Sequence, residues 1–134
     1  MRLLLISNST NPGEGYLEYP TPYIKDFLGD KAVNALFIPY AGVTFSFEAY
    51  EEKVNARFKE IGHHVTSIHR FINPIEAIEN AEAIVVGGGN TWQLVRMLHE
   101  KGLMKPIRKK VKEGTPYIGW SAGSNIACPT LKTT

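Results

Sequence analysis

The stretch AIVVGGGNTWQL, residues 83–94, decides the fold class that this sequence predicts. It begins with a short, continuous apolar run rich in β-branched side chains, which is typical of a buried strand. Three glycines follow this run, and from residue 91 onward apolar side chains recur at helical spacing. A strand, a tight turn and a helix in direct succession form the repeating unit of a parallel α/β sheet.

The same alternation continues on both sides of this stretch. Short apolar runs predict four further strands, at residues 2–7, 35–38, 64–68 and 115–119. Helical spacing of apolar residues predicts helices at residues 47–61, 74–80, 91–101 and 105–112, and in the later part of 16–28. Right-handed crossovers between parallel strands then predict one α/β domain over residues 1–134, a three-layer α/β/α sandwich with a mainly parallel sheet of the flavodoxin type.

The composition is that of an ordinary globular protein and excludes several partner classes. Fifteen Lys and Arg residues against thirteen Asp and Glu give a formal net charge of +2, which favours neither nucleic acid nor an anionic membrane as a partner. We interpret the basic run at residues 108–112 as the solvated face of a predicted helix. Because the chain has one cysteine, no secretory signal and no long apolar segment, we expect a cytoplasmic protein.

A candidate nucleophile follows the last predicted strand. Gly119-Trp120-Ser121-Ala122-Gly123 matches the G-x-S-x-G pattern, with an apolar strand before it and the start of a helix after it. Such a turn exposes the serine hydroxyl at a helix N-terminus, where the Ala122 N–H can donate to an oxyanion. The alternative is a turn of small residues that only lets strand and helix pack closely. The strand–turn–helix context favours Ser121 as the nucleophile.

The three glycines at residues 87–89 form a second candidate element. Their spacing matches neither of the common phosphate-binding patterns. Bare backbone at Gly88 and Gly89 would instead supply a second oxyanion donor beside the nucleophile. The alternative is a tight turn that needs positive φ, which seldom requires three glycines in a row.

Polar loops gather at one rim of the predicted sheet. The carboxyl ends of parallel strands meet at the same edge, and ligand sites of open α/β sheets lie there. Residues 8–10, 39–42 and 87–90 follow predicted strands and should reach this rim together with Ser121. Among them we expect Asn8 and Asn90 to contact a substrate.

The histidines at residues 63, 64 and 69 raise the possibility of a metal site. On a strand, His64 would face one side while His63 and His69 face the other, so the three would not converge. No carboxylate or cysteine lies beside them at ligand spacing. We therefore expect surface or strand-end roles for them, and neither a metal nor another cofactor.

Five motifs in a fixed order resemble those of a known family. They are LLLISNST at 3–10, FIPYAGVT at 37–44, IHR at 68–70, VVGGGNTWQL at 85–94 and YIGWSAGSNIACPT at 117–130. With these motifs the chain resembles peptidase E, the aspartyl dipeptidases of a serine peptidase family that also contains cyanophycinases. The resemblance implies a fold related to class I glutamine amidotransferases and metal-free hydrolysis of dipeptides with an N-terminal aspartate (Asp-X). It also implies that Ser121 is the nucleophile and that the Gly88 and Ala122 region forms the oxyanion hole.

The resemblance further implies a catalytic histidine and an acidic partner in a continuation beyond Thr134. All four histidines of this chain precede Ser121, and none matches a catalytic position of the family. We therefore expect an N-terminal portion of a peptidase E that a C-terminal segment or a second chain would complete, and that is nearly inert alone. No basic residue falls in a predicted rim loop, so we also expect the groups that bind the substrate's aspartate to lie elsewhere.

Two other functions stay open. An α/β-hydrolase-type esterase shares the G-x-S-x-G pattern, but its glycine-rich oxyanion loop follows an early strand, whereas the glycines here precede the last predicted strand. A truncated, non-catalytic binding module is the second alternative, and the missing base and acid favour it.

Overall fold

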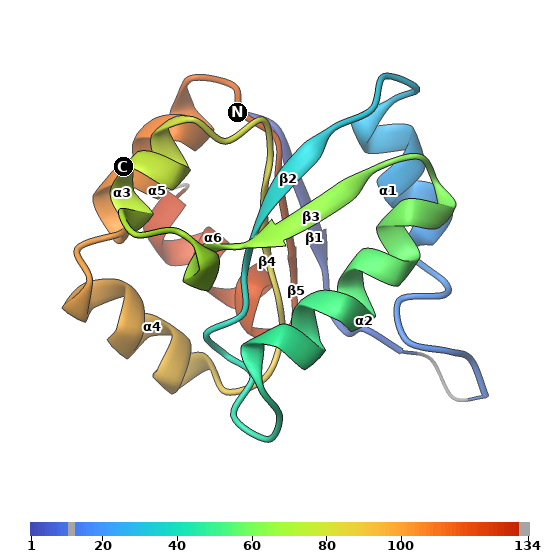
Figure 1. Ribbon diagram of the computed structural model, residues 1–134, viewed down its shortest axis with the longest axis horizontal. Coiled ribbons are helices and arrows are strands. Elements are labelled where there is room, and N and C mark those ends of the chain that lie inside the picture. Colours follow the sequence, from blue (N-terminus) through green and yellow to red (C-terminus); the bar gives the residue numbers. More distant parts are fainter. Residues whose placement is uncertain (11–12, 132–134) are drawn as a thin grey trace.

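Five strands form one parallel sheet in the order β1-β5-β4-β2-β3 (Figure 1). The computed structural model describes residues 1–10 and 13–131, with side chains described as far as Ala127. The strands are β1 (Leu3–Ile6), β2 (Asn34–Ile38), β3 (His64–Ser67), β4 (Ile84–Val86) and β5 (Tyr117–Trp120). The predicted parallel α/β class is confirmed. The strand order differs from the 2-1-3-4-5 order of flavodoxin-like sheets, because β4 and β5 lie between β1 and β2.

Helices cover both faces of the sheet, which gives the three predicted layers (Figure 1). They are α1 (Thr21–Leu28), α2 (Phe47–Glu60), α3 (Pro74–Glu79), α4 (Thr91–Glu100), α5 (Met104–Lys112) and α6 (Ala122–Leu131). A short 3₁₀ helix, η1 (Ile68–Arg70), follows β3. Helices α1 and α2 pack on one face, and α3 to α6 pack on the other. None of the helices in the described part of the chain is long and apolar enough to cross a membrane.

Each face of the sheet has its own apolar core. In β4, Ile84 and Val86 point into the core beneath α3 to α6, and Val85 points into the core beneath α1 and α2. All three side chains are fully buried. Covering on both faces explains why the strand is apolar without interruption rather than alternating.

The helix limits follow from capping groups that the sequence contains. The Ser46 hydroxyl accepts a hydrogen bond of 3.1 Å from the Ala49 N–H at the start of α2, and Gly62 lies just past its end with φ of 82°. The third predicted strand is shorter than expected because the Ser67 hydroxyl accepts from the His69 N–H and caps η1. As a result, His69 lies in a 3₁₀ helix and not on a strand.

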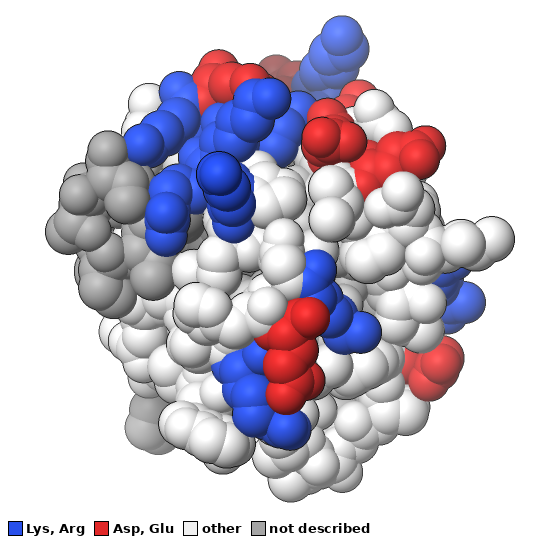
Figure 2. Space-filling view, turned by 90° about the vertical axis from the view of Figure 1, so that its left-hand side faces the viewer, with Lys and Arg blue, Asp and Glu red and all other residues white. Residues whose placement is uncertain are grey.

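The basic run at residues 108–112 lies on α5, as predicted. Ile107 and Val111 are buried, while the Lys and Arg side chains gather on the outer surface of the helix (Figure 2). These side chains, with Glu79 and Glu113, line a hollow of about 770 Å³. Burial of one stripe and solvation of the other is the arrangement of an amphipathic helix.

An ion pair joins α2 to the end of β3. The Glu51 carboxylate is mostly buried and accepts hydrogen bonds of 2.6–2.9 Å from the Arg70 guanidinium and of 2.6 Å from the Ser67 N–H. Burial acts to raise the pKa of Glu51, but the hydrogen bonds from Arg70 and Ser67 outweigh it and hold this pKa below its usual value. The charged carboxylate is therefore the form that the fold stabilises.

The depressed pKa of Glu51 predicts a pH-dependent contribution to stability. This contribution is present above the unfolded pKa of about 4.3 and is lost as the pH falls through the folded pKa. We expect Glu51→Gln to lower the free energy of unfolding at neutral pH by about 1–3 kcal/mol. We also expect this free energy to decrease less in the variant than in wild type as the pH is lowered. Urea unfolding of both proteins at neutral and acidic pH measures this. Glu52→Gln, at the exposed neighbouring position, is the control, and equal stability of Glu51→Gln and wild type at neutral pH would contradict the account.

Candidate active site

Ser121 occupies the turn between β5 and α6 in an unusual backbone conformation. Its φ of 52° lies in the left-handed region, which side chains other than glycine seldom adopt. The Ser121 N–H donates to the Ile6 carbonyl oxygen at 3.0 Å, and the Ser121 carbonyl accepts from the Asn125 N–H at 2.9 Å. A serine held in this conformation between a strand and a helix has the backbone shape that the G-x-S-x-G pattern predicts.

The glycines on either side of Ser121 are required for space. A Cβ at Gly119 would lie 2.6 Å from the Gly123 carbonyl oxygen, and a Cβ at Gly123 would overlap the Val86 carbonyl oxygen. The buried Tyr117 hydroxyl also donates to the Gly123 carbonyl at 2.7 Å. The first turn of α6 therefore packs directly on the ends of β4 and β5, and this packing fixes the position of Ser121.

The Ser121 hydroxyl has no base beside it in the described part of the chain. It is partly buried and donates to the Ser7 carbonyl oxygen, at the end of β1, at 3.3 Å. The hydrogen-bonding ring nitrogens of His63, His64 and His69 contact other groups, and His99 is exposed on α4. The hydroxyl is thus accessible but not activated by a histidine of residues 1–10 or 13–131.

The histidines have separate roles. Of the surface and strand-end roles that the sequence predicts, His63 has the second, because it is buried directly before β3. Its Nδ1 accepts from the Val33 N–H at 3.0 Å, so its Nε2 carries the proton and donates to the Gly29 carbonyl at 3.1 Å. His69 lies with its Nε2 3.1 Å from the Glu48 carboxylate. Across the described residues, His, Cys, Asp and Glu side chains do not gather in groups of three or more that could hold a metal ion.

The glycine loop lies directly against Ser121, as the sequence predicted. A Cβ at Gly88 would be 2.8 Å from the Ser121 Cβ and 3.2 Å from its Oγ. Gly89 has φ of 136°, a conformation open to glycine, and a Cβ there would overlap the Ala41 carbonyl oxygen. Both glycines therefore allow close approach of backbone segments, one to Ser121 and one to the loop after β2.

Unpaired backbone donors surround this contact. Within the described residues, the N–H groups of Gly88, Gly89 and Ala122 have no hydrogen-bond partner, whereas the neighbouring Gly87 and Asn90 N–H groups are bonded. Ala122 is the first residue of α6, where helix geometry leaves the N–H free and the helix dipole favours negative charge. Two segments with free donors thus meet at one serine hydroxyl.

The predicted rim residues Asn8 and Asn90 are both exposed, and the side-chain oxygen of each already accepts a hydrogen bond within the protein. The Asn8 Oδ1 accepts from the Tyr19 hydroxyl at 2.7 Å. The Asn90 Oδ1 accepts from the Gln93 N–H at 2.9 Å and caps α4. Each of these oxygens keeps one further acceptor site, and the amide nitrogens can donate to a substrate.

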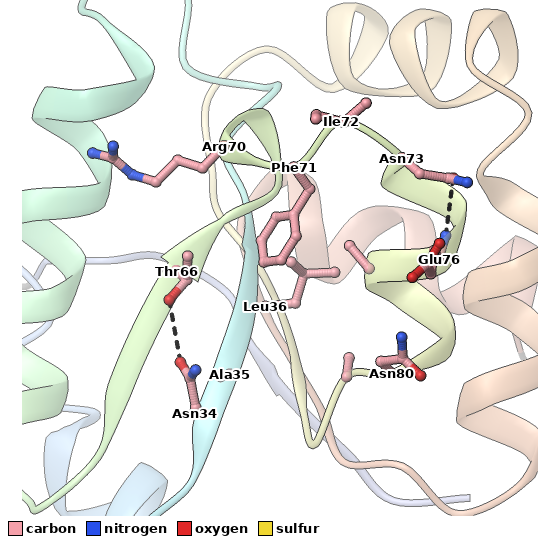
Figure 3. Close-up of a pocket in the computed structure, with 12 residues that line it drawn as sticks. Asn34, Ala35, Leu36, Thr66, Arg70, Phe71, Ile72, Asn73, Glu76 and Asn80 are labelled. Carbon is pink, nitrogen blue, oxygen red and sulfur yellow. Dashed lines mark hydrogen bonds between the residues drawn. The ribbon is translucent and has the colours of Figure 1, made fainter.

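One basic residue, Arg70, lies close to the carboxyl end of β3, outside the rim loops that the sequence predicts. It is the last residue of η1, which directly follows β3. Its guanidinium is bound by Glu51 and points away from the hollow beside it, toward α2 (Figure 3). In the sheet, β4 and β2 separate β5 from β3, so Arg70 lies apart from Ser121.

A hollow of about 630 Å³ also lies apart from Ser121. It is bounded by β2, β3 and α3, and Phe71 points into it over Leu36 (Figure 3). Its polar groups are partly paired with each other, since the Thr66 hydroxyl bonds to the Asn34 side chain at 3.2 Å. The hollow contributes no group to the Ser121 site.

The sequence reading missed three aromatic residues that support the site. The Trp120 indole N–H donates to the Tyr16 hydroxyl at 3.0 Å, and the Tyr16 hydroxyl donates to the Tyr50 hydroxyl at 3.2 Å. The Tyr50 hydroxyl donates to the Gly88 carbonyl at 2.9 Å. Helical spacing identifies Tyr50 only as a core residue. The one available signal was that a buried tyrosine needs a partner for its hydroxyl.

The fold and the site define an α/β protein that presents a serine on a strand-to-helix turn beside a glycine loop. Residues 3–134 match the sequence profile of peptidase family S51, and the chain belongs to this family. Because the chain belongs to this family, the alternative of an α/β-hydrolase-type esterase is excluded.

Several relatives carry the name peptidase E. The peptidase E of Nostoc sp. strain PCC 7120 is 56% identical over 132 residues, which cover 98% of this chain and 54% of that protein. The peptidase E of Shigella flexneri serotype 5b is 52% identical over 134 residues, which cover 100% of this chain and 58% of that protein. The chain thus spans little more than half the length of these relatives.

Two solved structures have the same fold. A protein of Listeria monocytogenes EGD-e superposes with a TM-score of 0.70 at 28% identity, over 93% of this chain and 60% of the other. A peptidase from an acI-B1 actinobacterium superposes with a TM-score of 0.72 at 19% identity, over 93% of this chain and 55% of the other. Both similarities support the observed arrangement of strands and helices.

Proposed function

We propose that Ser121 is the nucleophile of a serine-type dipeptidase that hydrolyses dipeptides with an N-terminal aspartate. The observation that carries this proposal is the left-handed Ser121 in contact with Gly88, with free N–H groups on both segments. The relatives named peptidase E, at 51–56% identity over nearly the whole chain, support the reaction class.

In the proposed reaction the Ser121 Oγ attacks the carbonyl carbon of the peptide bond and loses its proton to a base. The carbonyl oxygen becomes an oxyanion, which the N–H groups of Ala122 and of Gly88 or Gly89 stabilise by donating hydrogen bonds. The C–N bond then breaks, the leaving amine takes up the proton, and an acyl-enzyme forms on Ser121. Water hydrolyses the acyl-enzyme and releases the aspartate.

The base and its acidic partner are proposed to come from outside the described residues. No described histidine contacts the Ser121 hydroxyl, which instead donates to the Ser7 carbonyl. A C-terminal segment or a second chain would place a histidine beside this hydroxyl. The groups that bind the substrate's aspartate would also come from there, because the Arg70 guanidinium at the rim is bound by Glu51.

Substrate selectivity gives a direct test of this proposal. We expect the natural protein that carries this sequence to cleave Asp-Leu at least about 100-fold more efficiently than Asn-Leu, since loss of a charge-assisted contact costs several kcal/mol. Measuring kcat/KM for Asp-Leu, Asn-Leu and Ala-Leu checks this. Equal values for the three dipeptides would contradict Asp-X selectivity, although they would leave the serine mechanism standing.

A non-catalytic binding module is the second candidate. The Ser121 hydroxyl favours it, because this hydroxyl donates to the Ser7 carbonyl and not to a base. In that case the 134-residue chain should bind Asp-Leu saturably without hydrolysing it. Because the 134-residue chain alone is expected to be nearly inert under either function, calorimetric titration followed by chromatography of the same sample separates the two only when it is done with the natural protein. Turnover by the natural protein would exclude the binding module.

A further inference from the structure

Three aromatic side chains from separate segments form one hydrogen-bonded chain that ends on the glycine loop. Trp120 lies at the end of β5, Tyr16 in the segment between β1 and α1, and Tyr50 on α2. We infer that this chain of hydrogen bonds sets the orientation of the Gly88–Gly89 peptide, and that Tyr50 is the residue that positions the peptide. The inference rests on the proposed function, because it assigns this peptide to the proposed oxyanion hole.

The direction of every hydrogen bond in the chain is determined by its two ends. The indole N–H of Trp120 can only donate, and the carbonyl oxygen of Gly88 can only accept. The Tyr50 hydroxyl has one proton, which it donates to the Gly88 carbonyl at 2.9 Å, so it must accept from the Tyr16 hydroxyl at 3.2 Å. The Tyr16 hydroxyl has then used its own proton and accepts from the Trp120 indole N–H at 3.0 Å. The chain thus has one proton arrangement, and it delivers a donor to the Gly88 carbonyl.

Fixing the Gly88 carbonyl also fixes the Gly89 N–H. The two groups belong to the same trans peptide unit, in which the C=O and N–H bonds point in opposite directions. Because the carbonyl points toward Tyr50, the Gly89 N–H points away from Tyr50. This N–H has no partner among the described residues, so it is available to a ligand.

Without the Tyr50 hydroxyl, this peptide would have little to hold it. Glycine on both sides of the bond removes the steric barriers that keep other peptides in one orientation. A flip of the peptide plane would turn the carbonyl oxygen to the side that the N–H now occupies. An acceptor would then replace the donor that this peptide is inferred to offer to the oxyanion of the proposed reaction.

Burial keeps the hydrogen-bonded side chains rigid and the tyrosine hydroxyls neutral. Trp120 and Tyr50 are almost fully buried, and the Phe37 ring packs against both, with centroids 4.9 Å from Tyr50 and 6.3 Å from Trp120. Burial raises the pKa of both Tyr16 and Tyr50, so both hydroxyls keep the protons that the chain requires. The chain also starts at Trp120, next to Ser121, and so links the serine turn to the glycine loop.

The hydrogen bonds can be tested by NMR spectroscopy of the 134-residue chain, independently of any activity. In Tyr50→Phe we expect an upfield shift of the Gly88 carbonyl carbon resonance and a changed Gly89 amide resonance. In Tyr16→Phe we expect the Trp120 indole N–H resonance to move upfield, while that of the exposed Trp92 stays in place as an internal control. Unchanged Gly88 and Trp120 resonances in these variants would show that the inferred hydrogen bonds do not form. If Tyr50→Phe does not fold, Tyr16→Phe alone decides.

The positioning role needs kinetics on the natural protein with Asp-Leu. Loss of one oxyanion donor costs about 10²–10³ in kcat, so partial misorientation should lower kcat of Tyr50→Phe by about 10–100-fold with KM nearly unchanged. Tyr23→Phe, an exposed tyrosine on α1, is the matched control and should match wild type. An unchanged kcat in Tyr50→Phe would overturn the positioning role. Absence of turnover in wild type would instead refute the proposed function, and the inferred role in the oxyanion hole would be overturned with it.

Discussion

Replacing Ser121 by alanine is expected to lower kcat for Asp-Leu by about 10⁴–10⁶-fold in the natural protein. The reason is that alanine removes the oxygen atom that is proposed to attack the peptide carbonyl, while the free N–H groups of Gly88, Gly89 and Ala122 remain. Binding of the substrate should persist, because KM depends on contacts that this change leaves in place. Initial rates with the variant and with wild type, at saturating Asp-Leu, measure the effect.

Ser124→Ala is the matched control for this experiment. Ser124 lies on the same first turn of α6, but its position contributes no group to the proposed reaction. We expect its kcat to stay within about threefold of wild type. Wild-type rates in Ser121→Ala, with an intact circular dichroism spectrum, would show that another residue is the nucleophile.

Gly123→Ala is expected to destabilise the fold by about 3 kcal/mol or more. Its Cβ would overlap the Val86 carbonyl oxygen, which belongs to a central strand of the sheet and cannot move without disturbing β4. Relief of the overlap would push the first turn of α6 away from the sheet and separate Ser121 from Gly88. Urea unfolding of the 134-residue chain measures the loss in the free energy of unfolding.

Gly62→Ala separates crowding from backbone strain. Gly62 has φ of 82°, and nothing lies within 4 Å of a Cβ built there, so alanine adds only the cost of a left-handed residue. That cost is about 1–2 kcal/mol. If Gly123→Ala were no more destabilising than Gly62→Ala, close packing of α6 on β4 would not be what positions Ser121.

Local patterns predicted the elements of this fold well, because their causes are local. The run at Ala83 to Val86 had to be a strand covered on both faces, and Ser46 and Gly62 marked the ends of α2. The order of the strands had no such signal. Which strands become neighbours depends on how the crossovers pack, and no single segment of the sequence encodes that choice.

The same distinction holds for the candidate site. Ser121 and Gly88 lie in short motifs whose spacing has a direct physical meaning, and the structure brings the two into contact. The hydrogen bond from Trp120 to Tyr16 joins residues 104 positions apart, and that between Tyr16 and Tyr50 joins residues 34 positions apart. Such pairs are visible only once the sheet and its helices are assembled.

Two details of the third strand became visible only in the structure. The sequence left a surface role and a strand-end role open for His63, and the structure places it buried directly before β3, where the Val33 N–H and the Gly29 carbonyl satisfy both ring nitrogens. The strand itself ends one residue earlier than predicted, because the Ser67 hydroxyl caps η1.

The most direct test of the central claim is to identify the residue that an aspartyl phosphonate modifies in the natural protein. Used as its diphenyl ester, such a compound presents an electrophilic phosphorus: the serine oxygen bonds to phosphorus, a phenolate leaves, and a stable phosphonyl adduct forms in place of the acyl-enzyme. Peptide mapping by mass spectrometry locates the adduct. We expect modification of Ser121 alone, and with it loss of Asp-Leu hydrolysis. An adduct on another residue, or loss of hydrolysis with Ser121 unmodified, would contradict it.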